Sequence, residues 1–99
     1  GYLGIEPRAL TDDLANVLRA AGVEGVLIAR VLSEAPAANA GIEPGDIVTA
    51  IDGNPMKTPR ELIRYVGQLK PNKKVKITLL RQGEQQVVTV TLGDRSTAM

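Results

Sequence analysis

The side chains that could support catalysis are few in this sequence, and their arrangement does not favour it. The 99 residues include no histidine and no cysteine, which excludes Ser-His-Asp and Cys-His catalysis as well as imidazole or thiolate metal ligation. Asp12 and Asp13 form an adjacent carboxylate pair, but they lie where a helix is expected to begin and are typical of capping. We therefore expect no enzymatic activity from this chain by itself, and no metal or cofactor.

Main-chain chemistry is the alternative, and the first residues, Gly-Tyr-Leu-Gly-Ile, point to it. Glycine permits a positive φ and leaves space where other residues carry a Cβ atom. Gly1 and Gly4 therefore either shape a turn or let another group approach the backbone. The plain start of a strand is the other interpretation of these residues.

Length and composition indicate one small domain with an aliphatic core. A chain of 99 residues fits a single compact domain, and 43% of its residues are hydrophobic, with no Phe or Trp and two tyrosines. The net charge is +1, and Pro71 and Asn72 interrupt the short basic run at 70–74. Nucleic-acid binding needs clustered basic side chains, so this class of function is not expected.

Hydrophobic periodicity predicts an alternation of strands and helices along the chain. Alternating apolar residues predict strands, and apolar residues three or four apart predict helices. Thr58, Pro59 and Glu61 form the start signal of the longest helix. The expected elements are a strand from Ile5, a helix from Thr11 to Gly22, a strand over 26–32, a helical turn over 36–40, a strand over 47–51, a helix over 58–69, and a hairpin that turns at Gln82-Gly83.

Three segments carry a family resemblance: GYLGI at the start, GVLIARVLSEAPAANAGIEPGDIVTAIDG in the middle, and TPRELIRYVGQLKPNKKVKITLLRQGE towards the end. They resemble the PDZ domain, in the permuted form found in bacterial HtrA-type serine proteases of the DegP, DegQ and DegS group. The resemblance runs from Gly1 to about Leu92, and the middle segment is its most specific part. It implies an α+β fold, a small, partly open β-barrel or sandwich of five or six mostly antiparallel strands with two helices. The implied division is a PDZ domain over 1–93 and a tail over 94–99.

The resemblance also implies a binding site for the C-terminus of another chain. In such domains a loop, here Tyr2, Leu3, Gly4 and Ile5, holds the terminal carboxylate with its backbone amides, and Gly4 lets the peptide terminus approach. The peptide then adds to the free edge of the strand that begins at Ile5. The groove residues expected from this comparison and from helical spacing are Glu6, Leu62, Val66 and Leu69, with Ile63 turned more towards the core. Ordinary core packing is the alternative role for Leu62, Val66 and Leu69.

The function implied by the resemblance is peptide binding without chemistry of its own. The expected parent is a periplasmic serine endopeptidase whose protease domain is a further partner. The expected ligands are apolar C-termini of misfolded or outer-membrane proteins, bound either to tether substrate or to regulate the protease in a stress response. Two alternatives are a PDZ domain of another envelope system, such as a site-2 protease or a secretion component, and a structural interaction domain with an unused groove.

The last residue, Met99, has the chemistry of such a ligand, because it combines an apolar side chain with a free carboxylate. It could occupy the groove of a neighbouring copy, or belong to an unpacked tail.

Overall fold

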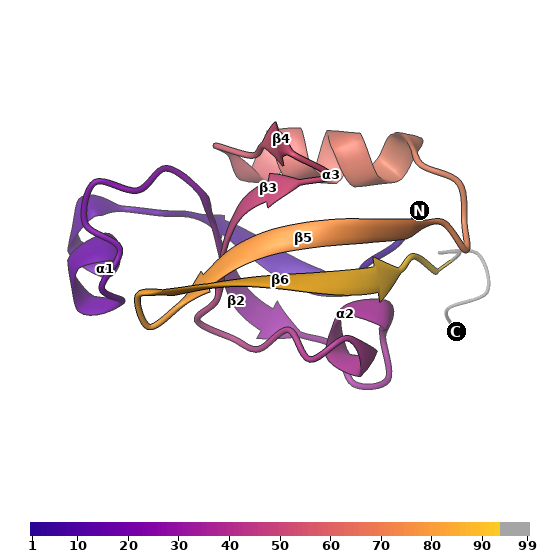
Figure 1. The fold of residues 1–99 in the computed structure, drawn as a ribbon, viewed down its shortest axis with the longest axis horizontal. Helices are drawn as coiled ribbons and strands as arrows, with labels where there is room; N and C mark the ends of the chain where they lie inside the picture. Colours follow the sequence, from indigo (N-terminus) through magenta and orange to yellow (C-terminus); the bar gives the residue numbers. More distant parts are fainter. Residues whose placement is uncertain (94–99) are drawn as a thin grey trace.

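Six antiparallel strands form one open sheet in the computed structural model, which describes residues 1–93. The strands are β1 (Ile5–Ala9), β2 (Val26–Val31), β3 (Ile47–Ile51), β4 (Asn54–Pro55), β5 (Lys74–Arg81) and β6 (Glu84–Thr91). Their order is β1-β2-β3-β5-β6, and β4 pairs with β3 outside this path (Figure 1). The sheet does not close, so one edge of β1 has no strand beside it, and the expected fold class is confirmed.

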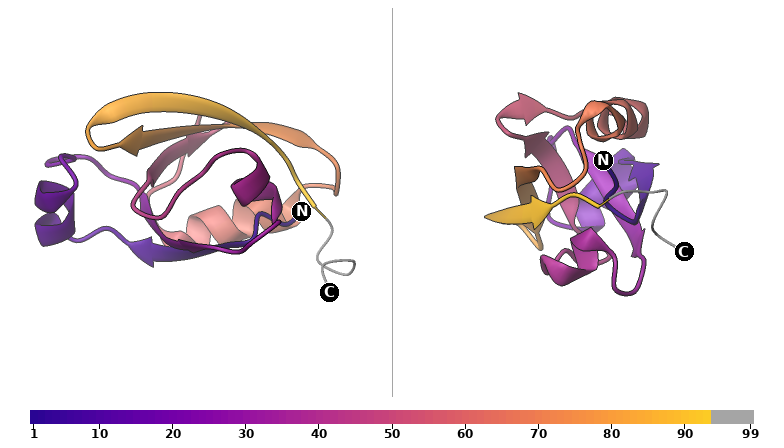
Figure 2. Two further views of the ribbon diagram at one scale, coloured as in Figure 1. Left: turned by 90° about the horizontal axis from the view of Figure 1, so that it is seen from below. Right: turned by 90° about the vertical axis from the view of Figure 1, so that its right-hand side faces the viewer.

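Three helices accompany the sheet: α1 (Asp12–Val17), α2 (Pro36–Asn39) and α3 (Pro59–Gln68). Viewed from the side, the strands curve around the core, with α3 and α2 on opposite sides of it (Figure 2). The tail over 94–99, including Met99, lies outside the described residues. None of the helices within residues 1–93 has the length and the apolar character that a membrane crossing requires.

The first helix is shorter than its sequence predicts. It begins as expected, because the Thr11 side chain accepts a hydrogen bond from the Leu14 N–H at 3.2 Å. It ends at Val17 and not near Gly22, so the expected end is wrong. The reason is local: Arg19 has a φ of 59°, and a residue in this left-handed region cannot continue a right-handed helix.

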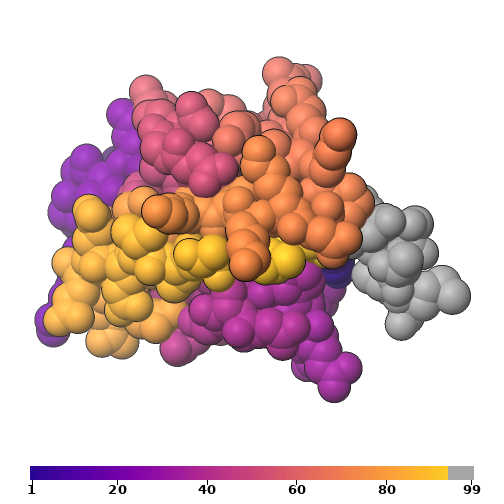
Figure 3. Space-filling view, turned by 45° about the vertical axis from the view of Figure 1, so that its right-hand side comes forward, coloured from indigo at the N-terminus to yellow at the C-terminus, as the bar shows by residue number. Residues whose placement is uncertain are grey.

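The β5–β6 hairpin has the predicted register and turn. Val75 lies opposite Val90 and Ile77 lies opposite Val88, so one face of each strand is apolar. Gln82 and Gly83 have φ values of 50° and 87°, as the tight turn between two twisted strands requires. The hairpin spreads across one face of the molecule, between α2 and the elements around α3 (Figure 3).

An aliphatic core joins these elements, as the composition predicts. Its buried members come from the loop before β1, from β2, β3, β5 and β6, from α2 and α3, and from connecting segments, and Ile5 of β1 packs against them. The most completely buried are Val26, Ile28, Ala37, Ile51, Val75, Ile77, Leu79 and Val90, each with no exposed surface. Because Leu62 and Val66 of α3 belong to the same buried cluster as residues of four strands, the position of α3 against the sheet is determined by packing.

A buried ion pair joins the turn before β3 to the end of β5. Asp46 is 1% exposed and accepts hydrogen bonds from Arg81 Nε at 2.9 Å and Nη2 at 2.8 Å. It also accepts one from the Glu43 N–H at 2.9 Å, and Arg81 Nη2 donates to the Gly41 carbonyl oxygen at 2.8 Å. The hydrogen bond to Asp46 raises the pKa of the Arg81 guanidinium, so Arg81 stays charged and balances the buried carboxylate.

Candidate functional site

A groove of about 480 Å³ lies between the N-terminal loop and α3. No charged side chain lines it, whereas charged side chains line two other hollows of the described surface. The lining residues are Gly1, Tyr2, Leu3, Gly4, Ile5, Pro7, Leu32, Leu62, Ile63, Val66 and Gly67. Its size and apolar walls are those of a site that binds a small apolar group.

The structure brings most of the predicted site residues to this groove and separates two from it. The loop 2–5, Leu62 and Val66 all line it. Glu6 does not, because its carboxylate pairs with Arg8 and Arg30. Leu69 is half-buried against the core, and its carbonyl oxygen accepts a hydrogen bond from the Gly1 amino group.

The prediction that Ile63 turns towards the core is wrong. Ile63 is 59% exposed, and its side chain lines the groove. Leu62 and Val66 are 2% and 5% exposed and therefore define the face of α3 that packs on the sheet. A helix turns by about 100° per residue, so Ile63, the residue after Leu62, does not share this buried face.

The carbonyl groups of Tyr2, Leu3 and Gly4 are all engaged inside the protein. The Tyr2 oxygen accepts from the Gly93 N–H at 2.9 Å, the Leu3 oxygen from the Ala37 N–H at 3.0 Å, and the Gly4 oxygen from the Leu32 N–H at 2.9 Å. Tyr2 and Gly93 also form an isolated antiparallel bridge. These bonds anchor the loop against α2, β2 and the end of β6.

The amide groups of the same loop, in contrast to its carbonyl groups, are left without hydrogen-bond partners within residues 1–93. The N–H groups of Leu3 and Gly4 donate to no acceptor within residues 1–93. Ile5 lies opposite Val31 in the antiparallel pair of β1 and β2. The hydrogen bond from the Leu32 N–H to the Gly4 oxygen shows that Ile5 and Val31 exchange no hydrogen bonds with each other. The Ile5 N–H therefore points away from β2 and towards the free edge. Three successive amides beside the groove are therefore free to bind an acceptor.

Gly4 is required by the conformation of this loop. Its φ is 76°, and a Cβ atom at this position would lie 2.2 Å from the Ala35 Cβ atom. The missing Cβ therefore faces α2 and not the groove. We expected Gly4 to make room for a ligand, but its immediate role is to let the loop fold so that the amides remain free.

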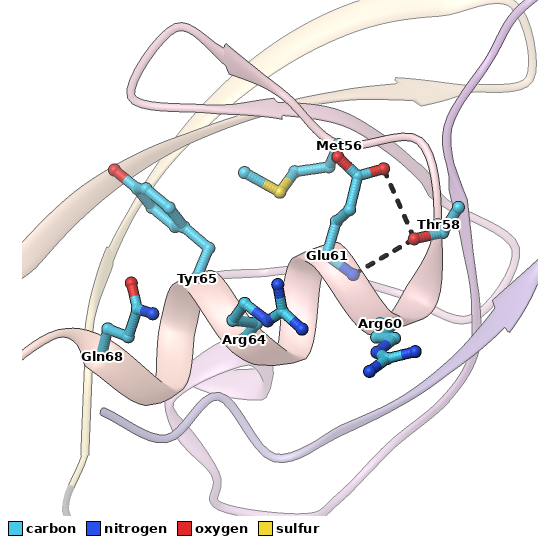
Figure 4. Close-up of a pocket in the computed structure, with 7 residues that line it drawn as sticks. All are labelled: Met56, Thr58, Arg60, Glu61, Arg64, Tyr65 and Gln68. Carbon is cyan, nitrogen blue, oxygen red and sulfur yellow. Dashed lines mark hydrogen bonds between the residues drawn. The ribbon is translucent and has the colours of Figure 1, made fainter.

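A second hollow, of about 580 Å³, lies on another side of α3 (Figure 4). Its lining is Met56, Thr58, Arg60, Glu61, Arg64, Tyr65 and Gln68. The Thr58 hydroxyl accepts from the Glu61 N–H at 3.2 Å and donates to Glu61 Oε1 at 3.4 Å (Figure 4). These bonds cap α3 as the sequence predicts.

Five residues that line the groove were not among the predicted binding residues: Gly1, Pro7, Leu32, Ile63 and Gly67. Ile63 and Gly67 could have been predicted from the sequence, because they are four residues apart and so lie on one face of the helix. Leu32 could not be found from helical spacing, because it follows β2 in the chain and only the tertiary structure places it beside the loop, where its N–H donates to the Gly4 carbonyl oxygen. Pro7 also required knowledge of which side of β1 has no neighbour.

Comparisons with known proteins agree with this architecture. The PDZ domain family matches residues 1–92. A relative in Rhizobium meliloti (strain 1021), named "Probable periplasmic serine endoprotease DegP-like", is 37% identical over 93 residues, which is 94% of this chain and 18% of the relative. This chain therefore spans about a fifth of the length of the curated relatives that it matches. Their names support the expected periplasmic location.

Solved structures show the same fold. The HtrA-type protease AlgW with a decapeptide superimposes with a TM-score of 0.85 at 34% identity, covering 94% of this chain and 29% of that one. The HtrA3 PDZ domain bound to a phage-derived ligand (FGRWV) gives a TM-score of 0.76 and covers 91% of this chain and 82% of that one. Its identity is 22%, so this second likeness supports the fold alone.

The sequence match over nearly all described residues, the open antiparallel sheet and the relatives lead to one conclusion: this chain belongs to the PDZ domain family, and it is a PDZ domain of the kind found in bacterial HtrA-type serine endoproteases.

Proposed function

We propose that this domain binds the C-terminal end of another polypeptide in the groove between β1 and α3. The terminal carboxylate accepts hydrogen bonds from the amides of Leu3, Gly4 and Ile5. The last side chain of the ligand enters the apolar groove, and its main chain adds to the edge of β1.

The free loop amides are the observation that supports this proposal most directly. Main-chain N–H groups without a partner are costly when they are withdrawn from water, so a loop that leaves them free beside an apolar groove favours a ligand with acceptor oxygens. A carboxylate supplies two such oxygens and a negative charge that several converging amides stabilise. The apolar walls contribute separately, because burying one aliphatic side chain stabilises a complex by about 1.5–3 kcal/mol.

The relatives indicate where such a domain acts. They are named periplasmic serine endoproteases, and solved structures of the HtrA-type protease AlgW contain a decapeptide or a tripeptide. We propose that the parent of this chain is also a periplasmic serine endopeptidase in protein quality control, in which this domain captures apolar C-termini of misfolded or outer-membrane proteins.

Capture serves the protease in one of two ways within this proposal. Binding can tether a substrate, which raises its effective concentration near the catalytic domain. It can also regulate the protease, but only if the peptide binds the active arrangement more tightly than the inactive one. Both modes use the same groove.

A comparison of two peptides tests the binding mode. A fluorescent hexapeptide that ends in valine is titrated in its acid form and in its C-terminally amidated form, and binding is followed by anisotropy. We expect the amide to bind at least about tenfold more weakly, because it loses the charge-assisted bonds to the loop. Equal affinities, or no binding of either form, would contradict the proposal and favour a structural domain with an unused groove.

A matched pair of variants locates the site. Ile63 lines the groove and is 59% exposed, whereas Val87 lies on β6, does not line the groove and is 57% exposed. We expect Ile63→Glu to weaken binding of the acid peptide, because it places a charge and a carboxylate at the groove. Val87→Glu should leave the affinity unchanged. A loss of binding only in the Val87 variant would place the site elsewhere.

A further inference from the structure

The free edge of β1 does not offer a continuous row of hydrogen-bonding groups. β1 pairs with β2 on one side and with no strand on the other. Because Ile5 and Val31 exchange no hydrogen bonds, both the N–H and the C=O of Ile5 face this edge. In an antiparallel pair the next residue that faces the same side is two positions further along, which is Pro7.

The partner of Pro7 gives independent evidence for this orientation. Pro7 lies opposite Ile28, although the register shifts between Glu6 and Pro7. The Ile28 N–H donates to the Asp46 oxygen at 2.8 Å, and the Ile28 oxygen accepts from the Gly45 N–H at 2.8 Å. The polar groups of Ile28 are thus directed away from β1, so the main chain of Pro7 faces the free edge as well.

Proline has no N–H group. The edge therefore provides a donor and an acceptor at Ile5 but only an acceptor at Pro7. Pro7 also lines the groove, so it lies in the path that an added strand would follow.

We propose, on the basis of the function proposed above, that Pro7 interrupts strand addition and restricts recognition to about the last three residues of the ligand. The terminal residue lies beside Ile5, and the third residue from the end lies opposite Pro7, where its carbonyl oxygen finds no donor. Residues further from the terminus then add little affinity, because the strand that would hold them has lost a ladder bond.

The first test compares ligand lengths on the unmodified domain. A tripeptide and a hexapeptide with the same last three residues, both with free carboxylates and acetylated amino ends, are titrated by calorimetry. We expect affinities within about threefold of each other, because the upstream residues make few additional bonds. A hexapeptide that binds more than about tenfold tighter would overturn the inference.

The second test restores the missing donor. Pro7→Ala should strengthen hexapeptide binding by about two- to tenfold, the gain of one ladder hydrogen bond. The new amide at position 7 should become protected from hydrogen exchange when the peptide binds. Pro71→Ala, a substitution in an exposed loop, is the matched control and should change neither quantity.

Two outcomes separate this inference from its alternatives. If acid peptides bind in preference to amides but Pro7→Ala changes neither affinity nor exchange, the inference fails while the proposed function stands. If the variant self-associates without binding peptide more tightly, Pro7 serves to prevent edge-to-edge pairing of domains, and the inference fails again. Absence of any peptide binding contradicts the proposed function itself.

Discussion

Two glycines that line the groove, Gly4 and Gly67, differ in whether the fold has room for a side chain at their position. Gly4 has a φ of 76°, and a side chain there would collide with Ala35. Gly67 lies inside α3, where glycine is less favourable than alanine, and a Cβ atom there would meet nothing within 4 Å. Packing therefore explains Gly4 but not Gly67, which lines the groove.

This contrast predicts stability changes of opposite sign. We expect Gly67→Ala to raise the free energy of unfolding by about 0.5–1 kcal/mol, because alanine loses less backbone entropy in a helix. Gly4→Ala should lower it by more than about 1 kcal/mol, because of its positive φ and the collision with Ala35. Urea denaturation of the two variants measures both values, and destabilisation by Gly67→Ala would show that the site is more tightly packed than described.

At the scale of elements, the turn before β3 depends on its ion pair with β5. Asp46 is almost completely buried, while the Arg81 side chain is 27% exposed. By contrast, Arg8 pairs with Glu6 at the surface, where their side chains are 63% and 39% exposed. Removing one partner of a buried pair leaves an uncompensated charge, whereas an exposed charge remains solvated.

Two arginine substitutions test this difference. We expect Arg81→Met to lower the free energy of unfolding by about 3 kcal/mol, the lower end of the range for a broken buried pair because Arg81 keeps some contact with water. Arg8→Met should cost less than about 1 kcal/mol. Thermal or urea unfolding followed by circular dichroism compares them, and equal losses would show that the Asp46 carboxylate finds another partner.

On the scale of the whole molecule, the groove joins parts that are far apart in the chain. The loop before β1 contributes the free amides, and α3, more than fifty residues later, contributes the apolar wall. Leu3, Leu62 and Val66 belong to the same core cluster and also line the groove. A ligand that binds there contacts the packed core directly, so it should stabilise the folded domain as a unit.

Ligand-linked stability is therefore a whole-molecule prediction. The acid peptide at a free concentration of 100 times its Kd should raise the free energy of unfolding by about 2.7 kcal/mol. The amidated peptide at the same concentration should raise it much less. Urea titrations with each peptide measure the difference, and equal stabilisation would mean that the carboxylate makes no contact with the loop amides.

Local patterns in the sequence were sufficient for most of the fold. Val75 and Val90 on facing strands, Gln82-Gly83 in the turn, and the Thr58 cap all depend on neighbouring residues, so their conformations follow from local preferences. The end of α1 could not be predicted from local sequence patterns. Apolar spacing continues beyond Val17, and the left-handed conformation of Arg19 has no signal in the sequence.

The features of the candidate site also fall into those that the sequence could predict and those that depend on tertiary structure. The sequence by itself determined that this chain has no histidine or cysteine for catalysis, that its core is aliphatic, and that its first residues suit a turn, because these depend on residue type alone. Only the tertiary structure decided that Ile63 lines the groove, that Glu6 does not line it, and that the main chain of Pro7 faces the open edge of β1. The physical reason is that a groove forms between segments that are distant in the sequence. Whether an N–H group or a side chain faces it depends on which other segments pack or pair with the opposite side of the same residue.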